Sequence, residues 1–209
     1  MKVLVTAGAT WVKVDDVRIL TNKFTGKTGL YVAQQLKERG HSVTLLINDH
    51  CIEKIKGLKV ISYRYFDDFK SVLMRNLAKN RYDAIIHMAA VSDYKVKNVK
   101  KGKIPSYQKK LALQLVPTEK LVKIIRRLCR QALLIQFKLE VKRKGLIEDA
   151  YQNLKENNSD FVVANALKDL VSGYKGFIVS REKHVIPVNS KVSLANNLCK
   201  LITLLSGSK

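Results

Sequence analysis

Cysteine is scarce in this sequence of 209 residues. The three cysteines, Cys51, Cys129 and Cys199, lie far apart, and none belongs to a C-x-x-C pair. This usage argues against disulfides and against a zinc site, and it is typical of a reducing compartment. We therefore predict a cytoplasmic protein with no metal ligands of its own.

Long apolar runs are also missing. No stretch approaches the roughly 20 apolar residues that cross a bilayer, and the opening Met1–Ala7 is too short for a signal-peptide core. No membrane segment is expected. Proline occurs only three times, and 46% of the residues are hydrophobic, which favours a globular chain with a real core. One domain over residues 1–209 is the expectation for this length.

Acidic residues are few: 17 of them stand against 39 lysines and arginines, giving a formal net charge of +22. Such a field attracts anions, so an anionic partner is expected. The lysines are spread over the whole chain without a recognisable nucleic-acid-binding motif. We interpret most of them as solvated surface residues and assign part of the remainder to highly phosphorylated small substrates. Nucleic acid is not the expected partner, and a basic nucleic-acid-binding protein is kept only as an alternative, as is an NAD(P)-dependent Rossmann-type oxidoreductase.

Two phosphate-binding fingerprints are absent. No G-x-G-x-x-G follows the first apolar run, which argues against an NAD(P)-dependent oxidoreductase. Thr25-Gly26-Lys27-Thr28 resembles the end of a P-loop, but Thr21 stands where that motif needs glycine. What remains is a helix beginning near Gly26, whose free N–H groups favour a phosphate. The alternative is that its glycines only permit close packing on a sheet.

Apolar runs of strand length alternate with helical patterns. This alternation predicts βαβ units and an α/β, three-layer Rossmann-like fold with a mostly parallel sheet. Strands are expected at Lys2–Ala7, Ser42–Ile47, Val60–Phe66, Asp83–Met88, Lys110–Leu115, Leu133–Phe137 and Asp160–Ala164, and a hairpin at Gly176–Ser180 and His184–Val188. Helices are expected at Gly26–Arg39, Asp67–Lys79, Pro117–Arg130, Leu146–Asn157 and Ser193–Leu205. The segment 92–116, after the central strand, is predicted to protrude.

Ligands of open α/β sheets bind at the carboxyl ends of the strands. The loop after the first strand begins with Gly8 and runs to Gly26 before a helix starts. The loop after Asp83–Met88 begins with Ala89 and Ala90, whose small side chains permit close approach by a ligand. These two loops are the predicted binding edge.

Six colinear segments resemble one family, the phosphopantothenoylcysteine synthetases. They are DDVRILTNKFTGKTG at 15–29, MAAVSDY at 88–94, KIPS at 103–106, LVPT at 115–118, QFKLE at 136–140 and DFVVAN at 160–165. Several positions depart from the family pattern: Ala9 and Gln136 stand where glycine is common, Phe24 where serine is usual, Pro105 within a lysine-rich stretch, and Asn153 and Asn157 where bacterial members carry lysines. These departures resemble the stand-alone, eukaryote-like branch.

The resemblance implies a ligase that joins L-cysteine to 4'-phosphopantothenate in coenzyme A biosynthesis. The acid is activated by CTP or ATP as an acyl-nucleotidylate, and the sequence leaves the choice of nucleotide open. Magnesium enters with the nucleotide, and no flavin is expected on this chain. The resemblance further implies a homodimer, in which the protruding segment reaches the partner's site, and a separate flavin-dependent decarboxylase as a possible partner.

Site residues follow from motif position. The resemblance assigns catalytic roles to Asn22, Lys103 and Arg18, with Lys103 on the phosphates and Asn22 on the acyl-nucleotidylate. Nucleotide contacts fall to Gly8, Met88, Ala89, Ala90, Asp93, Lys103, Pro117, Thr118 and Phe137, and substrate contacts to Asn22, Gly26, Lys27 and Asn165. Structural alternatives stay open: Arg18 as the partner of Asp15 or Asp16, and Phe137 as a core residue.

Overall fold

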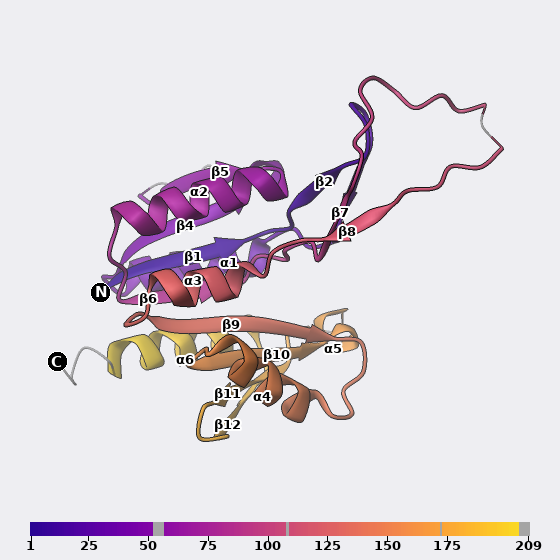
Figure 1. The fold of residues 1–209 in the computed structure, drawn as a ribbon. Coiled ribbons are helices and arrows are strands. Elements are labelled where there is room, and N and C mark those ends of the chain that lie inside the picture. Colours follow the sequence, from indigo (N-terminus) through magenta and orange to yellow (C-terminus); the bar gives the residue numbers. More distant parts are fainter. Residues whose placement is uncertain (52–56, 108, 172, 205–209) are drawn as a thin grey trace.

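The computed structural model describes residues 1–51, 57–107, 109–171 and 173–204. Its main sheet has eight strands in the order β12-β11-β10-β9-β6-β1-β4-β5 (Figure 1). The strands are β1 Lys2–Ala7, β4 Ser42–Asn48, β5 Lys59–Tyr63, β6 Ala84–His87, β9 Leu133–Glu140, β10 Phe161–Ala166, β11 Gly176–Ser180 and β12 Val185–Val188. All neighbours from β5 to β10 pair in parallel, whereas β11 and β12 form an antiparallel hairpin at one edge. The predicted α/β architecture is therefore confirmed.

Helices cover both faces of this sheet. They are α1 Lys27–Glu38, α2 Phe66–Lys79, α3 Leu121–Leu128, α4 Leu146–Asn157, α5 Leu167–Val171 and α6 Lys191–Leu204, with a short 3-10 helix at Asp49–Cys51. No helix in the described part of the chain is both long and apolar enough to cross a bilayer.

The strands bury alternate residues on opposite faces. In β1, Val3 and Val5 pack in the cluster that contains residues of α1 and α6, whereas Leu4 packs with Phe69 of α2 and Ile125 of α3. This is the two-residue period of a strand that is covered on both sides. Helix α1 buries its Gly29, Val32, Ala33 and Leu36 face, as its sequence period predicts.

The protruding segment is confirmed, but its internal structure differs from expectation. It is a long arm whose root is a two-stranded ribbon of β7 Tyr94–Val96 and β8 Leu115–Pro117 (Figure 1). The predicted strand Lys110–Leu115 is wrong except for its last residue. Leu111, Leu113 and Leu115 do alternate with other residues, but all three are exposed on the arm. Their alternation therefore does not mark the buried face of a sheet.

Pro117 does not begin a helix. It ends β8, where it pairs with Tyr94 in a ribbon of only two strands. The N–H that proline lacks therefore removes no hydrogen bond from the interior of a sheet. Helix α3 begins four residues later, at Leu121. The short hairpin of β2 Trp11–Lys13 and β3 Ile19–Thr21 and the five-residue helix α5 were not predicted.

A buried carboxylate joins the β2–β3 hairpin to the arm. Asp15 is 1% exposed, and its oxygens accept N–H bonds from Val17 (2.8 Å), Arg18 (2.6 Å) and Ile104 (2.9 Å). The Arg18 guanidinium donates to Asp15 and to the carbonyl oxygen of Ile104 at 3.1 Å. These bonds, that from Ile104 foremost, hold the pKa of Asp15 well below its usual range. The arm is therefore anchored by interactions that need an ionised carboxylate.

We predict that Asp15→Asn loosens the arm. An amide cannot accept the same set of N–H bonds and loses the ion pair with Arg18. Limited proteolysis should cleave within residues 97–110 at least several-fold faster in the variant, while Glu156→Gln on α4 keeps the wild-type rate. Wild-type protection should hold above about pH 4, the ordinary pKa of Asp, and be lost only as the pH falls toward the lowered folded pKa. Equal cleavage rates for the variant and the wild type would contradict this anchor.

Candidate active site

The pairing of β1 with β6 continues past both strand ends. Met88 N donates to Thr6 O at 3.0 Å, Ala90 N to Gly8 O at 3.0 Å and Thr10 N to Ala90 O at 3.2 Å. The two loops that the sequence singled out therefore lie side by side at the carboxyl edge of the sheet.

Glycine is required where α1 meets this edge. Gly26, just before α1, has φ 79°, and a Cβ on it would lie 2.7 Å from the backbone nitrogen of Gly8. No larger residue fits without displacing the β1 loop. The close approach brings the first turn of α1 to the ends of β1 and β6.

A cleft of about 430 Å³ opens at this point. It is lined by the β1 and α1 termini, the β6 and β9 ends, α5 and the first residue of α6: Ala7, Gly8, Lys23, Phe24, Thr25, Gly26, Lys27, Thr28, Gly29, Met88, Ala89, Ala90, Phe137, Lys138, Leu139, Asn165, Leu167, Leu170, Tyr174 and Lys191. Among these described lining residues four are lysines and none is acidic.

The cleft is built for an anion. Lys23, Lys27, Lys138 and Lys191 surround it, and only Lys138 has a carboxylate partner, Glu140 at 2.8 Å, in the described part of the chain. The first turn of α1 contains no acidic residue, and its cap makes no side-chain hydrogen bond, so its N–H groups remain available. Free N–H groups, the helix dipole and ammonium groups all favour a phosphate.

Eight of the predicted site residues line this cleft: Gly8, Gly26, Lys27, Met88, Ala89, Ala90, Phe137 and Asn165. Asn22 is held at the edge of the same loops, since its Nδ2 donates to Ala90 O at 3.2 Å. The structure thus brings together residues that are up to 157 positions apart in the chain, from Gly8 to Asn165.

The other predicted residues lie outside the cleft lining. Arg18 forms an ion pair with Asp15, which is the structural alternative that the sequence left open. Asp93 pairs with Lys120 at 2.6 Å, and its carbonyl oxygen accepts Thr118 N–H at 2.9 Å. Pro117 belongs to β8, and Lys103 is exposed on the arm. Their proposed roles remain predictions.

Some lining residues escaped sequence reasoning. Tyr174 and Lys191 come from the end of the chain, and Leu167 and Leu170 come from the unpredicted helix α5. A five-residue helix shows no periodic pattern, and α6 begins two residues before its predicted start. Ser190, a residue type that often caps the start of a helix, could have predicted that α6 begins at Lys191.

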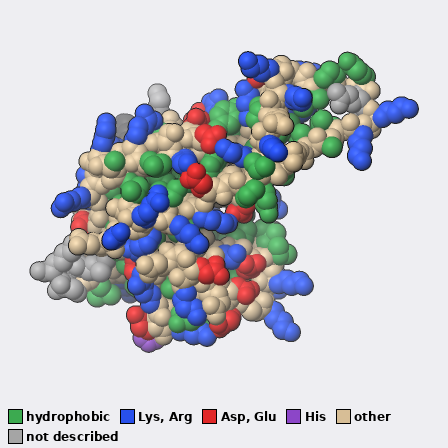
Figure 2. Space-filling model, viewed as in Figure 1, with side chains coloured by type: hydrophobic (Ala, Val, Ile, Leu, Met, Phe, Trp, Pro, Cys, Tyr) green, Lys and Arg blue, Asp and Glu red, His purple; other side chains and the backbone are tan. Residues whose placement is uncertain are grey.

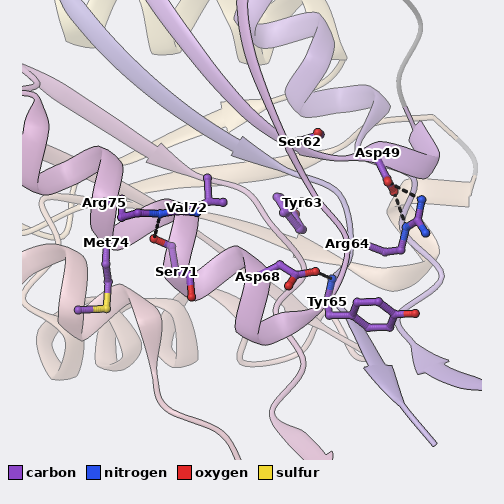
Figure 3. A pocket seen from close by; sticks show the side chains of 10 residues that line it. All are labelled: Asp49, Ser62, Tyr63, Arg64, Tyr65, Asp68, Ser71, Val72, Met74 and Arg75. Carbon is purple, nitrogen blue, oxygen red and sulfur yellow. Dashed lines mark hydrogen bonds and ion pairs between the residues drawn. The ribbon is translucent and has the colours of Figure 1, made fainter. Parts of the chain in front are cut away.

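A second hollow lies between the end of β5 and α2 (Figure 3). Some of its polar side chains already have partners: Arg64 Nη2 lies 2.6 Å from Asp49 Oδ2, and Arg75 donates to the backbone carbonyl oxygen of Ser71. Figure 3 shows the Asp49–Arg64 pair at one end and Met74 and Arg75 at the other. The hollow carries charges of both signs, whereas the described lining of the cleft carries four lysines and no carboxylate, so the cleft is the better candidate for an anionic ligand.

A buried hydrogen bond supports the β6 loop. Thr6 and His87 are both buried, and the Thr6 hydroxyl shares a hydrogen bond of 2.9 Å with His87 Nδ1 while Ala89 N donates to the same hydroxyl at 3.3 Å. Burial lowers the pKa of His87 to about 4, so its ring is neutral at neutral pH. The chain therefore fixes the Ala89 backbone through an uncharged pair.

The spacing Tyr-x-x-x-Lys of short-chain oxidoreductases occurs at Tyr151 and Lys155 on α4. The Lys155 ammonium lies 4.7 Å from the centre of the Tyr151 ring, and neither residue lines the cleft. With the glycine fingerprint also absent, the site does not support the oxidoreductase alternative.

The fold and the cleft define an α/β domain with a lysine-lined cleft, suited to an anionic ligand, at the carboxyl edge of a parallel sheet. Residues 1–205 match the family model "DNA/pantothenate metabolism flavoprotein C-terminal domain". The chain belongs to this family.

Similar proteins agree with this assignment. The chain is 35% identical over 169 residues to the coenzyme A biosynthesis bifunctional protein CoaBC of Thermococcus kodakarensis, a match that covers 80% of this chain and 41% of that protein. It is also similar to the crystal structure of the DNA/pantothenate metabolism flavoprotein from Streptococcus pneumoniae, with TM-score 0.87 and 26% identity over 98% of this chain and 99% of that one. The fold matches the Cab2 H337A complex with phosphopantothenate-cysteine, with TM-score 0.79, 19% identity and coverage of 99% and 88%. The chain spans about half the length of the curated relatives it matches.

We predict that His87 makes stability depend on pH. Below pH 6.5 the unfolded histidine binds a proton, whereas the folded one binds it only near pH 4. Between pH 7.5 and pH 4.5 the free energy of unfolding therefore falls by about 2 to 3 kcal/mol because of this group. His87→Leu should remove this part of the pH dependence. Urea denaturation at pH 7.5 and pH 4.5 measures it, with the exposed His184→Gln as the control. The same pH slope in His87→Leu and the wild type would show that the histidine does not have this role.

Proposed function

We propose that the chain is the ligase that condenses 4'-phosphopantothenate with L-cysteine in coenzyme A biosynthesis, in the cytoplasm. The observation that carries the proposal is the cleft, with four lysines, the open start of α1 and no acidic lining residue among those described. A cleft of this composition can hold a phosphorylated carboxylic acid next to a nucleoside triphosphate. The family and the names of the relatives support the same reaction.

The chemistry has two steps. The carboxylate of 4'-phosphopantothenate attacks the α-phosphorus of CTP or ATP, and pyrophosphate leaves. The cysteine amine then attacks the acyl carbon of the acyl-nucleotidylate and loses its proton, and the nucleoside monophosphate leaves. Both steps bring anions or partial negative charges together, so positioned cations and N–H donors lower the barrier more than a general base does. The lysines around the cleft, the α1 N–H groups and Asn22 provide these groups.

Magnesium fits this site as a companion of the nucleotide. The described cleft-lining residues contain no carboxylate, so the phosphates and water rather than side chains would hold most of its coordination positions. The ion supplies charge neutralisation on the phosphates when it is bound. We propose no flavin on this chain. A separate flavin-dependent decarboxylase remains part of the proposal as a partner acting on the product.

The arm completes the site of a second copy in this proposal. Between Tyr94 and Thr118 it carries seven lysines and no acidic residue: Lys95, Lys97, Lys100, Lys101, Lys103, Lys109 and Lys110. Six apolar side chains are exposed along it: Tyr94, Val99, Tyr107, Leu111, Leu113 and Leu115. Figure 2 shows such basic and apolar side chains together on the projecting part of the molecule. Lys103 does not line the cleft of its own chain, so a homodimer gives it a place to act.

We predict that Lys103→Ala lowers kcat by about 100-fold or more, because an ammonium on the phosphates stabilises the charge that develops during activation. The assay follows pyrophosphate release with 4'-phosphopantothenate, L-cysteine, magnesium and either CTP or ATP, and identifies the product by mass. Lys101→Ala, two residues away on the same arm, is the matched control and should stay within threefold of wild type. Failure of the wild type to release pyrophosphate with either nucleotide would refute the ligase.

Mixing two impaired variants tests the dimer. Lys103→Ala lacks the arm lysine but keeps an intact cleft, whereas Asn22→Asp damages the cleft edge but keeps an intact arm. If the arm acts on the partner's cleft, a mixed dimer contains one complete site, so refolding the two variants together should restore up to about a quarter of wild-type activity. Light scattering should give twice the chain mass. An additive mixture with no recovery would place Lys103 at its own cleft.

A further inference from the structure

Two buried side chains hold the backbone of the loop after β1, residues 7–10. The Tyr63 hydroxyl, at the end of β5, directs its one proton at Ala7 O (2.6 Å) and Gly8 O (3.0 Å). Asn48 Nδ2, at the end of β4, donates to Ala9 O at 2.7 Å. Asn48 is 1% and Tyr63 3% exposed. Three consecutive carbonyl oxygens therefore take their orientation from donors on the two neighbouring strands.

The donors are themselves fixed in place. The Tyr63 ring packs against Phe69 of α2, with 4.3 Å between the ring centroids. Asn48 Nδ2 also donates to Arg64 O at 3.2 Å, and its Oδ1 accepts His50 N–H at 2.9 Å. A backbone carbonyl oxygen can only accept, so the contacts of Nδ2 determine which end of the amide is nitrogen. Neither donor can turn away without losing these contacts.

The donors lie on the side of the loop that faces away from the ligand. Ala7 and Gly8 line the cleft, whereas Asn48 and Tyr63 are not among its described lining residues. Tyr63 packs in the core cluster of α2 and α3, and the cleft is lined from the other face by α1, α5 and α6. The C=O and N–H of a trans peptide point in opposite directions. The peptide groups after Ala7 and Gly8 therefore keep their oxygens on the α2 side and direct their N–H groups the other way.

This orientation matters because the cleft is built for an anion. A peptide group is negative at its oxygen and positive at its N–H, and successive N–H groups directed at a cavity attract anions. A carbonyl oxygen turned into the cleft would repel a phosphate and compete for its lysines. Gly8, at φ 83°, lacks the Cβ that restricts other residues, so its own backbone does not prevent such a rotation.

We propose that Asn48 and Tyr63 are positioning residues for phosphate binding. Their side chains hold the carbonyl oxygens of residues 7–9 on the α2 side, so that the loop presents no acceptor to the triphosphate. This inference rests on the ligase proposed above, through the anionic ligand that the cleft receives. A residue with only a structural role would change the stability of the fold, whereas these two side chains set the affinity for phosphate.

Tyr63→Phe tests this role, because the ring keeps its place against α2 and only the hydroxyl is lost. The Kd of inorganic pyrophosphate with magnesium, measured by titration calorimetry, should rise about fivefold, as expected for one lost hydrogen bond. The KM for the nucleotide should rise by the same factor. The kcat and the KM for L-cysteine should stay within twofold of wild type.

Tyr82→Phe is the matched control. Tyr82 is also buried, and its hydroxyl donates to Asn76 at the opposite end of the sheet. The variant should lose a similar amount of stability toward urea and leave the Kd of pyrophosphate and every kinetic constant unchanged. Asn48→Ala is an independent second variant. It removes the donor to Ala9 O and should weaken pyrophosphate binding by at least the same factor.

The outcomes separate this inference from the proposed reaction. If wild type binds pyrophosphate and neither Tyr63→Phe nor Asn48→Ala changes its Kd, the inference is overturned. It is also overturned if Tyr63→Phe lowers kcat or raises the KM for L-cysteine as much as the KM for the nucleotide, because the hydroxyl then supports the fold alone. Wild type that binds pyrophosphate with the expected response to Tyr63→Phe, yet forms no product, would refute the ligase and leave the positioning role. Wild type that binds neither pyrophosphate nor a nucleotide would refute both.

Discussion

The contact between β1 and β6 is the constraint on which the rest of this molecule depends. The two strands lie in the middle of the sheet, and their hydrogen bonding continues through Met88, Ala90 and Thr10 after the strands end. Because of this continuation, the two loops cannot separate. Gly26 then packs on the backbone of Gly8, which fixes the start of α1 over the same point. The cleft is a consequence of a parallel sheet whose two central strands stay paired beyond their ends.

Much of this arrangement could be predicted from the sequence. Strands that are covered on both faces show continuous apolar runs, and helices such as α1 show one apolar face, so the central sheet and its helices were placed within a few residues. The arm and the β2–β3 hairpin could not be resolved in the same way. Their strands have three residues each, which is too short for a period. The alternation of Leu111, Leu113 and Leu115 was misleading because all three are exposed.

The site was predictable to the extent that it follows strand ends. Gly8, Ala89 and Asn165 each lie at or after the end of a strand, so the topology of a parallel sheet brings them to one edge. Phe137 was predicted to end its strand, but β9 continues past it to Glu140. Tyr174 and Lys191 reach the cleft through the chain reversal after β10, which local sequence does not specify. Motif position indicated Arg18 for the site, and this role stays a prediction. The fold pairs its guanidinium with Asp15, a buried carboxylate that would be costly without a cation.

The arm shows how the excess of positive charge is organised. Acidic side chains hold part of the arm, since Asp15 and Asp16 accept the Ile104 and Gly102 N–H groups and the Lys95 ammonium lies 3.5 Å from the Asp67 carboxylate. Beyond the root, none of the arm's other lysines forms an ion pair with a described residue of this chain. A segment with so many cations and exposed apolar side chains suits contact with a surface that supplies anions. The phosphates of a substrate held in a second cleft meet this requirement, because the cleft itself contributes lysines and no described acid. Part of the excess positive charge is thus concentrated at the arm and at the cleft, where the proposed phosphorylated substrates would bind.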